Sequence, residues 1–312
     1  MIDRGDSMRD FFRITISLCA VALLLPGLVL ADTERQEKSL DEIARALSNP
    51  VSAISYVGND FEYRSYQGDL PGADEQSGES YLIKPAFGIP LANGKNILLR
   101  AAIPVRLSQP KYVADREYYD FLIRQKADSM PGDGVFESGH SFLGDVMYDI
   151  AYGGVNDNGW IFMYGLAGVL STSKDGSAAR NQRLLGPEVA FGKETSWGVL
   201  GAWLSHVVDV SGDSTADIDS ELTSARMFFA YSLGNGWQIF SNPTITYDWE
   251  AASGNKLLLP IGGGVSKVSR LGGLPLKFAM DVQNYIVSPD AYGPEWLLTF
   301  SVTPVFPNLF QR

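Results

Sequence analysis

Twelve segments of this sequence alternate polar and apolar residues with a period of two, and the connections between them are alternately short and long. A period of two is typical of a β-strand whose two faces meet different environments. Each segment is long enough for the roughly 9 to 11 residues that a tilted strand needs to cross a bilayer. The segments lie near residues 52–66, 80–91, 96–107, 141–154, 160–172, 183–193, 196–210, 220–233, 237–250, 256–270, 274–287 and 295–307.

The connections distinguish a membrane barrel from a soluble sandwich. Tight turns are predicted at Asn93-Gly94, Asp157-Asn158-Gly159, Glu194-Thr195, Asn235-Gly236 and Gly272-Gly273. Longer polar links lie between them, at residues 67–79, 108–140, 173–182, 211–219, 251–255 and 288–294. Outer-membrane barrels have short periplasmic turns and longer outer loops, whereas a soluble sandwich has no reason to alternate them. We therefore predict an all-β fold, a closed antiparallel transmembrane β-barrel of about twelve strands.

Side-chain alternation agrees with a barrel. In the last segment, Trp296, Leu298, Phe300, Val302 and Phe306 share one face, and Glu295, Thr299, Ser301 and Thr303 share the other. The apolar face is expected to meet lipid and the polar face the lumen. Several tryptophans stand beside turns or loops, which predicts two interfacial aromatic girdles.

The N-terminus has the features of an export signal. Three arginines precede an uncharged apolar stretch over residues 14–30, and Val29-Leu30-Ala31 supplies the small residues of a cleavage site. We expect residues 1–31 to be a signal peptide that is cleaved after Sec-type export; an uncleaved anchor is the alternative. Residues 32–50 would then form a periplasmic segment with a short helix near 38–47, ended by Asn49-Pro50, and residues 51–312 the barrel.

Composition excludes other classes. Hydrophobic residues make up 45% and charged residues 20% of the chain, which excludes disorder, and no long apolar run follows Ala31, which excludes a multispanning helical protein. The net charge of -11 offers no basic surface for nucleic acid.

Several short motifs resemble those of a known family. They are Ala46-Leu47-Ser48-Asn49-Pro50-Val51, Leu99-Arg100 with Ile103-Pro104-Val105, Gly144-Asp145, Gly186-Pro187, Tyr247-Asp248-Trp249-Glu250, and Pro260-Ile261 followed by Leu271-Gly272-Gly273-Leu274-Pro275. In order and spacing, over residues 44–307, they resemble the Gram-negative outer-membrane β-barrel transporters related to the "MetA-pathway of phenol degradation" group. The sequence departs from that pattern at Lys84, Leu297 and Thr299, where the family tends to have Gln, Gly and Arg.

The resemblance implies an outer-membrane channel for small, aromatic or apolar, molecules. The partners it implies are outer-membrane lipid and lipopolysaccharide, a small-molecule solute, and the barrel-assembly machinery during biogenesis. No cofactor is implied.

Charged residues are predicted to line the lumen. Extending the alternation places eleven of them inward, namely Lys84, Arg100, Arg106, Asp145, Asp149, Glu188, Arg226, Asp248, Glu250, Lys277 and Asp281. These five cations and six anions are compatible with a narrow selective pathway. They are equally compatible with a closed, salt-bridged lumen in a structural or adhesion barrel, because buried charges are tolerated when they are paired.

A lipid-modifying enzyme is the third hypothesis. Ser205-His206 has the residue types of a nucleophile and its base, but adjacent strand residues point to opposite faces, so we predict no enzyme. The chain has only two histidines, His140 and His206, and we predict no metal site. Whether the acidic loop over residues 209–221 collects Ca²⁺ stays open.

The longest connection, residues 108–140, is too long to be a mere link. Tyr118, Phe121 and Leu122 lie at helical spacing in its middle, and Pro110 and Pro131-Gly132 flank them. We predict a short amphipathic helix that folds over the outer opening and gates it, with an exposed loop as the alternative.

Overall fold

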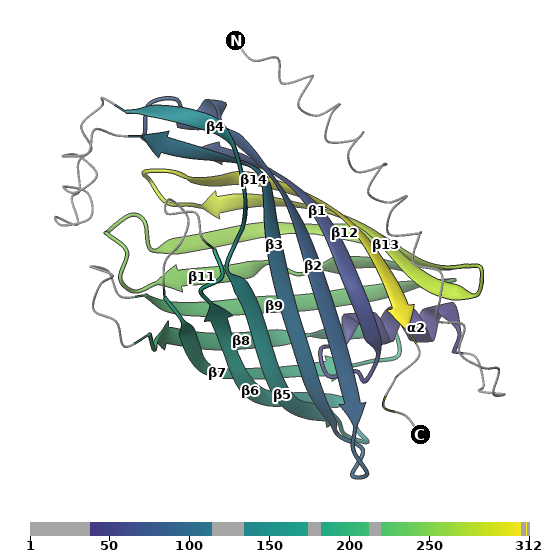
Figure 1. The fold of residues 1–312 in the computed structure, drawn as a ribbon. Helices are drawn as coiled ribbons and strands as arrows, with labels where there is room; N and C mark the ends of the chain where they lie inside the picture. Colours follow the sequence, from purple (N-terminus) through teal and green to yellow (C-terminus); the bar gives the residue numbers. More distant parts are fainter. Residues whose placement is uncertain (1–37, 114–133, 174–181, 212–219, 307–309, 311–312) are drawn as a thin grey trace. The chain divides into compact units, whose positions relative to one another are not determined.

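A computed structural model describes residues 38–113, 134–173, 182–211, 220–306 and 310. Fourteen strands form one antiparallel sheet (Figure 1). They are β1 (Ser55–Gln67), β2 (Ser77–Pro90), β3 (Asn96–Val113), β4 (Val135–Leu143), β5 (Val146–Val155), β6 (Trp160–Leu170), β7 (Leu184–Glu194), β8 (Gly198–Asp209), β9 (Glu221–Gly234), β10 (Trp237–Ser241), β11 (Thr244–Asp248), β12 (Leu257–Leu271), β13 (Leu274–Val287) and β14 (Gly293–Phe306).

The sheet closes on itself and has twelve positions around its wall. The last strand, β14, pairs with the first, β1, so no edge is left. Both β4 and β5 pair with β3, and both β10 and β11 lie between β9 and β12, so each of these two pairs is one wall strand with a break. The breaks fall at Gly144-Asp145 and Asn242-Pro243, where a residue without a Cβ and one without a backbone N–H interrupt the ladder. The predicted twelve-strand barrel is confirmed.

A single α-helix, α2 (Leu40–Ser48), precedes the first strand, and a 3-10 turn, Ala73–Glu75, lies between β1 and β2. Asp41 and Glu42 stand in the first turn of α2 and Arg45 in its last, the charge order that a helix dipole favours. The helix lies where the sequence predicts it, and Asn49-Pro50 ends it. Among the described residues, no helix is long and apolar enough to cross a bilayer.

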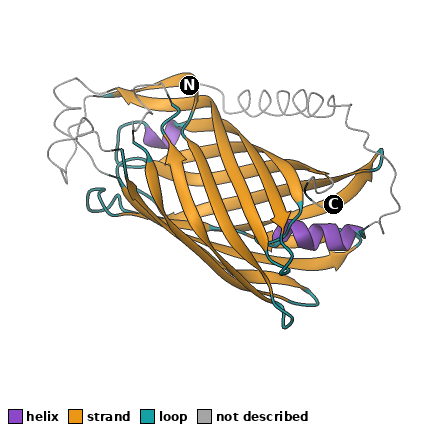
Figure 2. Cartoon of the chain, turned by 60° about the horizontal axis from the view of Figure 1, so that its bottom comes forward, coloured by secondary structure: helices purple, strands orange, loops and turns teal. Residues whose placement is uncertain are grey.

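The outer wall is apolar. In β6, Phe162, Tyr164 and Leu166 are about half exposed, whereas Ile161 and Met163 are buried. The same alternation of exposed apolar and covered residues runs through β7, β9 and β13. Figure 2 shows how the strands curve around to form the wall of the barrel. Exposed Trp160 and Trp237 follow short turns, and exposed Trp249 and Trp296 stand beside long loops, as in two interfacial girdles. A closed barrel with this outer surface is built to span a membrane.

Adjacent residues of β8 test the assignment of the two faces. Leu204 is 44% exposed on the outer wall, while Ser205 faces inward beside Glu188. Leu204→Lys should lower the free energy of unfolding by about 2–4 kcal/mol, because it places a cation in lipid. Ser205→Lys should cost much less. Urea unfolding followed by the gel shift between folded and boiled protein measures both variants, and equal losses would contradict the assignment.

Candidate functional site in the barrel lumen

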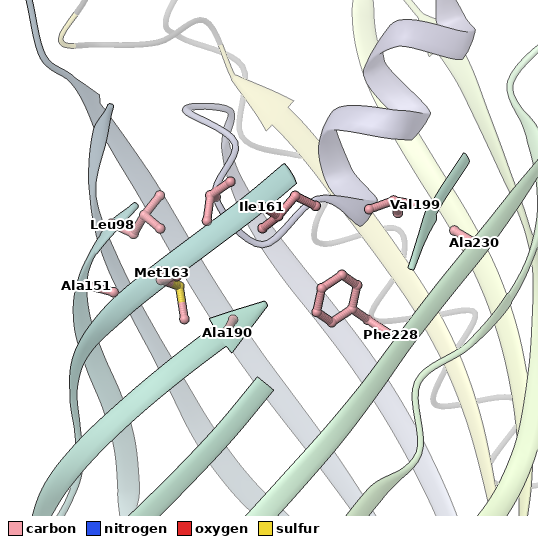
Figure 3. Close-up of a cluster of buried hydrophobic side chains, with 9 residues drawn as sticks. Leu98, Ala151, Ile161, Met163, Ala190, Val199, Phe228 and Ala230 are labelled. Carbon is pink, nitrogen blue, oxygen red and sulfur yellow. The ribbon is translucent and has the colours of Figure 1, made fainter. Parts of the chain in front are cut away.

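The end of the barrel that carries the short turns is filled by apolar side chains. Residues of β3, β5, β6, β7, β8 and β9 point inward and pack around Val51, which precedes β1 (Figure 3). Val51, Ile161 and Val199 are at most 1% exposed. The cluster consists of Val51, Leu98, Ala151, Ile161, Met163, Ala190, Val199, Phe228 and Ala230. Because lumen-facing side chains are buried here, this part of the lumen is packed rather than open.

Hydrogen bonds hold residues 49–51 against the inner wall. The side chain of Asn96 donates to the carbonyl of Val51 at 2.7 Å, and Arg100 Nη1 donates to the carbonyl of Pro50 at 2.8 Å. The carboxamide of Asn49 contacts Glu194 Oε2 at 3.3 Å. These contacts join a segment outside the sheet to β3 and β7.

Helix α2 completes this closure. Ile43 and Ala44 pack against the inward-facing Val268 and Val305. The Asp41 carboxylate accepts hydrogen bonds from the backbone N–H groups of Asn235 and Gly236 in the β9–β10 turn, and Arg45 donates to the carbonyl of Ser196 in the β7–β8 turn at 2.9 Å. Figure 1 shows α2 at the end of the barrel where β14 ends. We call residues 40–54 the N-terminal plug.

A charge network centred on Arg100 contacts the plug, since Arg100 donates to the carbonyl of Pro50. Its guanidinium forms a two-pronged ion pair with Asp149, with Nε at 2.7 and 3.1 Å from the two carboxylate oxygens. Arg100 also lies 3.7 Å from Glu188, which is 2% exposed and accepts a hydrogen bond from Trp203 Nε1 at 3.0 Å. The Arg100 guanidinium stacks over the Trp203 ring at 4.1 Å. Three of the predicted lumen residues, Arg100, Asp149 and Glu188, therefore form one partnered cluster.

Four other charged residues that were predicted to face the lumen differ in whether they have a partner. Lys84 forms an ion pair with Asp60, and Asp281 accepts a hydrogen bond from Gln283 at 2.6 Å. Arg226 is exposed to the lumen, lies 5.3 Å from the Trp203 ring and donates to Thr244 at 3.2 Å. Lys277 lies 5.5 Å from the Phe240 ring. Neither Arg226 nor Lys277 forms an ion pair with a residue that the structure describes.

Toward the long loops the lumen widens into a cavity of about 600 Å³. Its wall combines cations, aromatic rings and aliphatic side chains, and Arg106 and Asp145 of the predicted set belong to it. The lining residues are Arg64, Tyr66, Pro104, Arg106, Gln109, Pro110, Lys111, Tyr112, Phe142, Gly144, Asp145, Met147, Val169, Leu184, Leu222 and Tyr292. Four rings contact one another in succession, in the order Tyr66, Tyr292, Phe136, Tyr112, with neighbouring centroids 4.7 to 5.0 Å apart. Tyr66 and Tyr292 are stacked, whereas Tyr112 meets Phe136 edge to face.

Of three acids predicted in the lumen wall, one lies in a loop instead, and two cap turns at the margin of the wall. The strand that was expected to extend to residue 250 ends at Asp248, so Glu250 stands in the following loop. Asp248 accepts hydrogen bonds from the backbone N–H groups of Glu250 and Ala251, which makes it the cap of that turn. Asp145 likewise caps a loop, because it accepts from the backbone of Thr172 and Ser173 at the break between β4 and β5.

Sequence reasoning missed the charges of β1. Asp60 pairs with Lys84, and Glu62 pairs with Arg64 at 3.3 Å. Alternation within the recognised segment 52–66 would have placed all three β1 residues on one face. The plug was also missed as a part of the lumen, since residues 52–54 were expected to begin the first strand.

The remaining predictions concern residues that the structure does not describe. The signal peptide, the middle of the 108–140 loop with Tyr118, Phe121 and Leu122, and most of the acidic 209–221 loop lie outside the described ranges, as does the side chain of His140. The outer gate and the Ca²⁺ site therefore stay predictions.

Ser205 and His206 lie on opposite sides of the wall. Ser205 pairs with Ser224 on the lumen side, whereas His206 Nδ1 lies 2.9 Å from Thr223 Oγ1 and its Nε2 3.6 Å from Glu221, on the outer face. The nucleophile and base of the enzyme hypothesis are thus not brought together. Within the described ranges, no three His, Cys, Asp or Glu side chains are grouped to hold a metal ion.

Comparison with known proteins identifies the architecture. No protein-family model and no curated protein matches the sequence. The fold is similar to that of an outer-membrane channel. That channel, from Pseudomonas putida F1, superposes with a TM-score of 0.57 at 10% sequence identity, over 83% of this chain and 98% of the channel.

Two other solved barrels are less similar. A FadL homologue from Pseudomonas aeruginosa has a TM-score of 0.39 at 8% identity, over 86% of this chain and 94% of its own. Outer membrane phospholipase A from Escherichia coli has a TM-score of 0.39 at 10% identity, over 88% and 100%.

Proposed function

We propose that this protein is an outer-membrane channel for small molecules and that the N-terminal plug closes its periplasmic mouth. The short turns and the plug share one end of the barrel, and short turns are periplasmic in outer-membrane barrels. The cavity at the other end would receive solute from outside the cell. The apolar outer wall would contact outer-membrane lipid and lipopolysaccharide, and assembly machinery would insert it during biogenesis.

One observation carries this proposal, namely that the segment against which the wall side chains pack in the obstructed part of the lumen is not part of the wall. Residues 40–54 precede β1, which begins at Ser55, and pair with no strand. The segment could leave the lumen without breaking a strand ladder. A packed lumen built from wall side chains alone would have no such way to open.

We further assign the chain to the transporters related to the "MetA-pathway of phenol degradation" group. Two of the motifs that carry this resemblance lie at the plug, and a third lies in the cavity wall. Asn49, Pro50 and Val51 form the inner end of the plug, and Arg100 donates to the carbonyl of Pro50. Gly144-Asp145 marks the cavity wall. A transporter role for aromatic or apolar solutes is consistent with the stacked rings of the cavity.

A structural barrel with a closed lumen is the second candidate, and the Arg100 network favours it. A charge cluster in which Arg100 pairs with Asp149 and Glu188 is what such a lumen would contain.

Solute entry into liposomes separates the two candidates. Residues 32–312 are purified and reconstituted into liposomes, and the uptake of a panel of radiolabelled aromatic and aliphatic solutes is measured. A channel admits some of the panel faster than protein-free liposomes do and excludes a large sugar polymer. Uptake equal to that of protein-free liposomes for every solute, with folding confirmed by the gel shift, would favour the structural barrel.

A further inference from the structure

The charge of the outer cavity differs from that of the Arg100 network. Near the plug, Arg100 faces two carboxylates, Asp149 and Glu188. The cavity wall has three cations, Arg64, Arg106 and Lys111, and one acid, Asp145. That acid already accepts two backbone hydrogen bonds. The cavity is therefore locally positive in a chain whose net charge is -11.

Arg106 is the cation best placed to hold a ligand. It lies six residues beyond Arg100 on β3, or about 20 Å along the strand. One of its nitrogens donates to Ser80 Oγ at 2.8 Å, and the guanidinium forms no ion pair with any residue that the structure describes. A guanidinium has five N–H donors, so most of its donors remain for an anion.

Other polar groups of the cavity also lack partners. Arg64 uses one nitrogen for Glu62, while its buried Nε has no hydrogen-bond acceptor among the described residues. The buried hydroxyl of Tyr292 has none either. Burial raises the pKa of Tyr292, so this hydroxyl stays protonated and remains a donor. Buried donors without acceptors are rare in folded proteins, and these two lie in the wall of one cavity.

The rest of the wall suits an apolar body. Met147, Leu184 and Leu222 face the cavity together with Phe142 and the rings of Tyr66, Tyr112 and Tyr292. A volume of about 600 Å³ is in the usual range for small-molecule pockets. A simple inorganic anion would leave this apolar surface uncovered.

We propose that the outer cavity binds an amphipathic organic anion, with its carboxylate on Arg106 and its aromatic or aliphatic body against the Met147, Leu184 and Leu222 side. This inference rests on the proposed channel function and names its solute class.

The test is equilibrium binding to the full chain, without residues 1–31, in phospholipid nanodiscs, since detergent would occupy the apolar wall. Four probes separate the contributions: benzoate and octanoate are the amphipathic anions, acetate has the charge alone, and benzyl alcohol has the ring alone. Benzoate, octanoate or both should bind at least about tenfold more tightly than acetate and benzyl alcohol, because only the amphipathic anions combine a charge-assisted hydrogen bond with apolar burial. The preferred body, ring or chain, follows from which of the two binds better.

Variants locate the site. In the Arg106→Gln variant, benzoate and octanoate should no longer bind more tightly than benzyl alcohol. In the Arg106→Lys variant, part of this difference in affinity should remain. Lys193→Gln is the matched control, because Lys193 lies over the Trp160 ring on the outer face of the wall. This variant should bind the four probes as the unaltered chain does. If Arg106→Gln does not fold, the probe comparison in the unaltered chain still decides.

The inference would be overturned if neither benzoate nor octanoate binds more tightly than benzyl alcohol, or if neither binds more tightly than acetate. It would also be overturned if no probe binds, or if the Arg106→Gln variant binds unchanged. Binding at equilibrium requires no passage through the plug. Selective binding without liposome uptake would therefore contradict the channel and support the anion site. Uptake without selective binding would support the channel and contradict the anion site.

Discussion

Deleting residues 40–52 should convert a barrel that seldom conducts into one that conducts continuously. A minor conformation that lies a few kcal/mol above the major one is populated at about 0.1–10%. If the open state is such a minor conformation, removing the plug should raise the time-averaged conductance by roughly tenfold or more. The barrel should still form, because β1 begins at Ser55 and closes against β14 without the plug. The apolar faces of Ile161 and Val199 would then meet water, which costs some stability.

Single-channel recording in planar bilayers measures the effect. A chain that lacks only residues 32–37 is the matched control, since it is shortened at the N-terminus but keeps the whole plug, and it should conduct as the unaltered chain does. The gel shift between folded and boiled protein confirms that each variant is a barrel. A folded deletion variant with unchanged conductance would show that the obstruction lies elsewhere, for instance in the outer loop predicted from residues 108–140.

Arg100→Gln should lower the free energy of unfolding by about 3–5 kcal/mol, because it leaves the buried Glu188 and the partly buried Asp149 without their cation. Asp149 and Glu188 would then both lose their contact with the guanidinium. Of the contacts described above for this pair, the hydrogen bond from Trp203 to Glu188 would remain. Arg226→Gln should cost less than about 1 kcal/mol, since Arg226 is exposed to the lumen and forms no ion pair within the described ranges.

Unfolding in guanidinium chloride, followed by the intrinsic fluorescence of the tryptophans, compares these variants. Adding Asp149→Asn to Arg100→Gln removes one of the stranded charges and should restore part of the loss, which a merely steric effect of the glutamine would not. If Arg100→Gln and Arg226→Gln prove equally mild, the Arg100 network contributes little to stability.

The wall of the barrel was predictable from sequence because its period is short and unambiguous. One side chain in two meets lipid, so the faces of β6, β8 and β14 follow from counting. Long-range closure required no further information, since a spanning sheet cannot leave an edge in lipid. The breaks at Gly144-Asp145 and Asn242-Pro243 were not predicted, although glycine and proline are the residues that permit them.

The plug was not predictable by the same means. A short helix near residues 38–47, ended by Asn49-Pro50, was expected from the sequence. Its place in the lumen, however, depends on contacts of α2 with residues far along the chain, such as Val268 and Val305. Residues 52–54 continue the apolar pattern and were assigned to the first strand, whereas they lead out of the plug. The alternation of polar and apolar residues along one segment does not show which wall strands the plug contacts inside the barrel. The paired state of Arg100 against the unpaired state of Arg226 is likewise a property of the closed barrel.

Thiol labelling of a single lumen position from each side of the membrane tests the central claim most directly. Met147→Cys, in the chain without residues 1–31, places one thiol in the outer cavity. A second single-cysteine variant at Asp157, in a short turn, reports which end of the barrel faces the medium. In oriented proteoliposomes, a membrane-impermeant maleimide should reach Met147→Cys from the long-loop side only, and from both sides once residues 40–52 are deleted. Equal labelling from both sides in the chain that keeps its plug, or labelling from neither, would contradict an outer cavity closed off from the periplasm by residues 40–54.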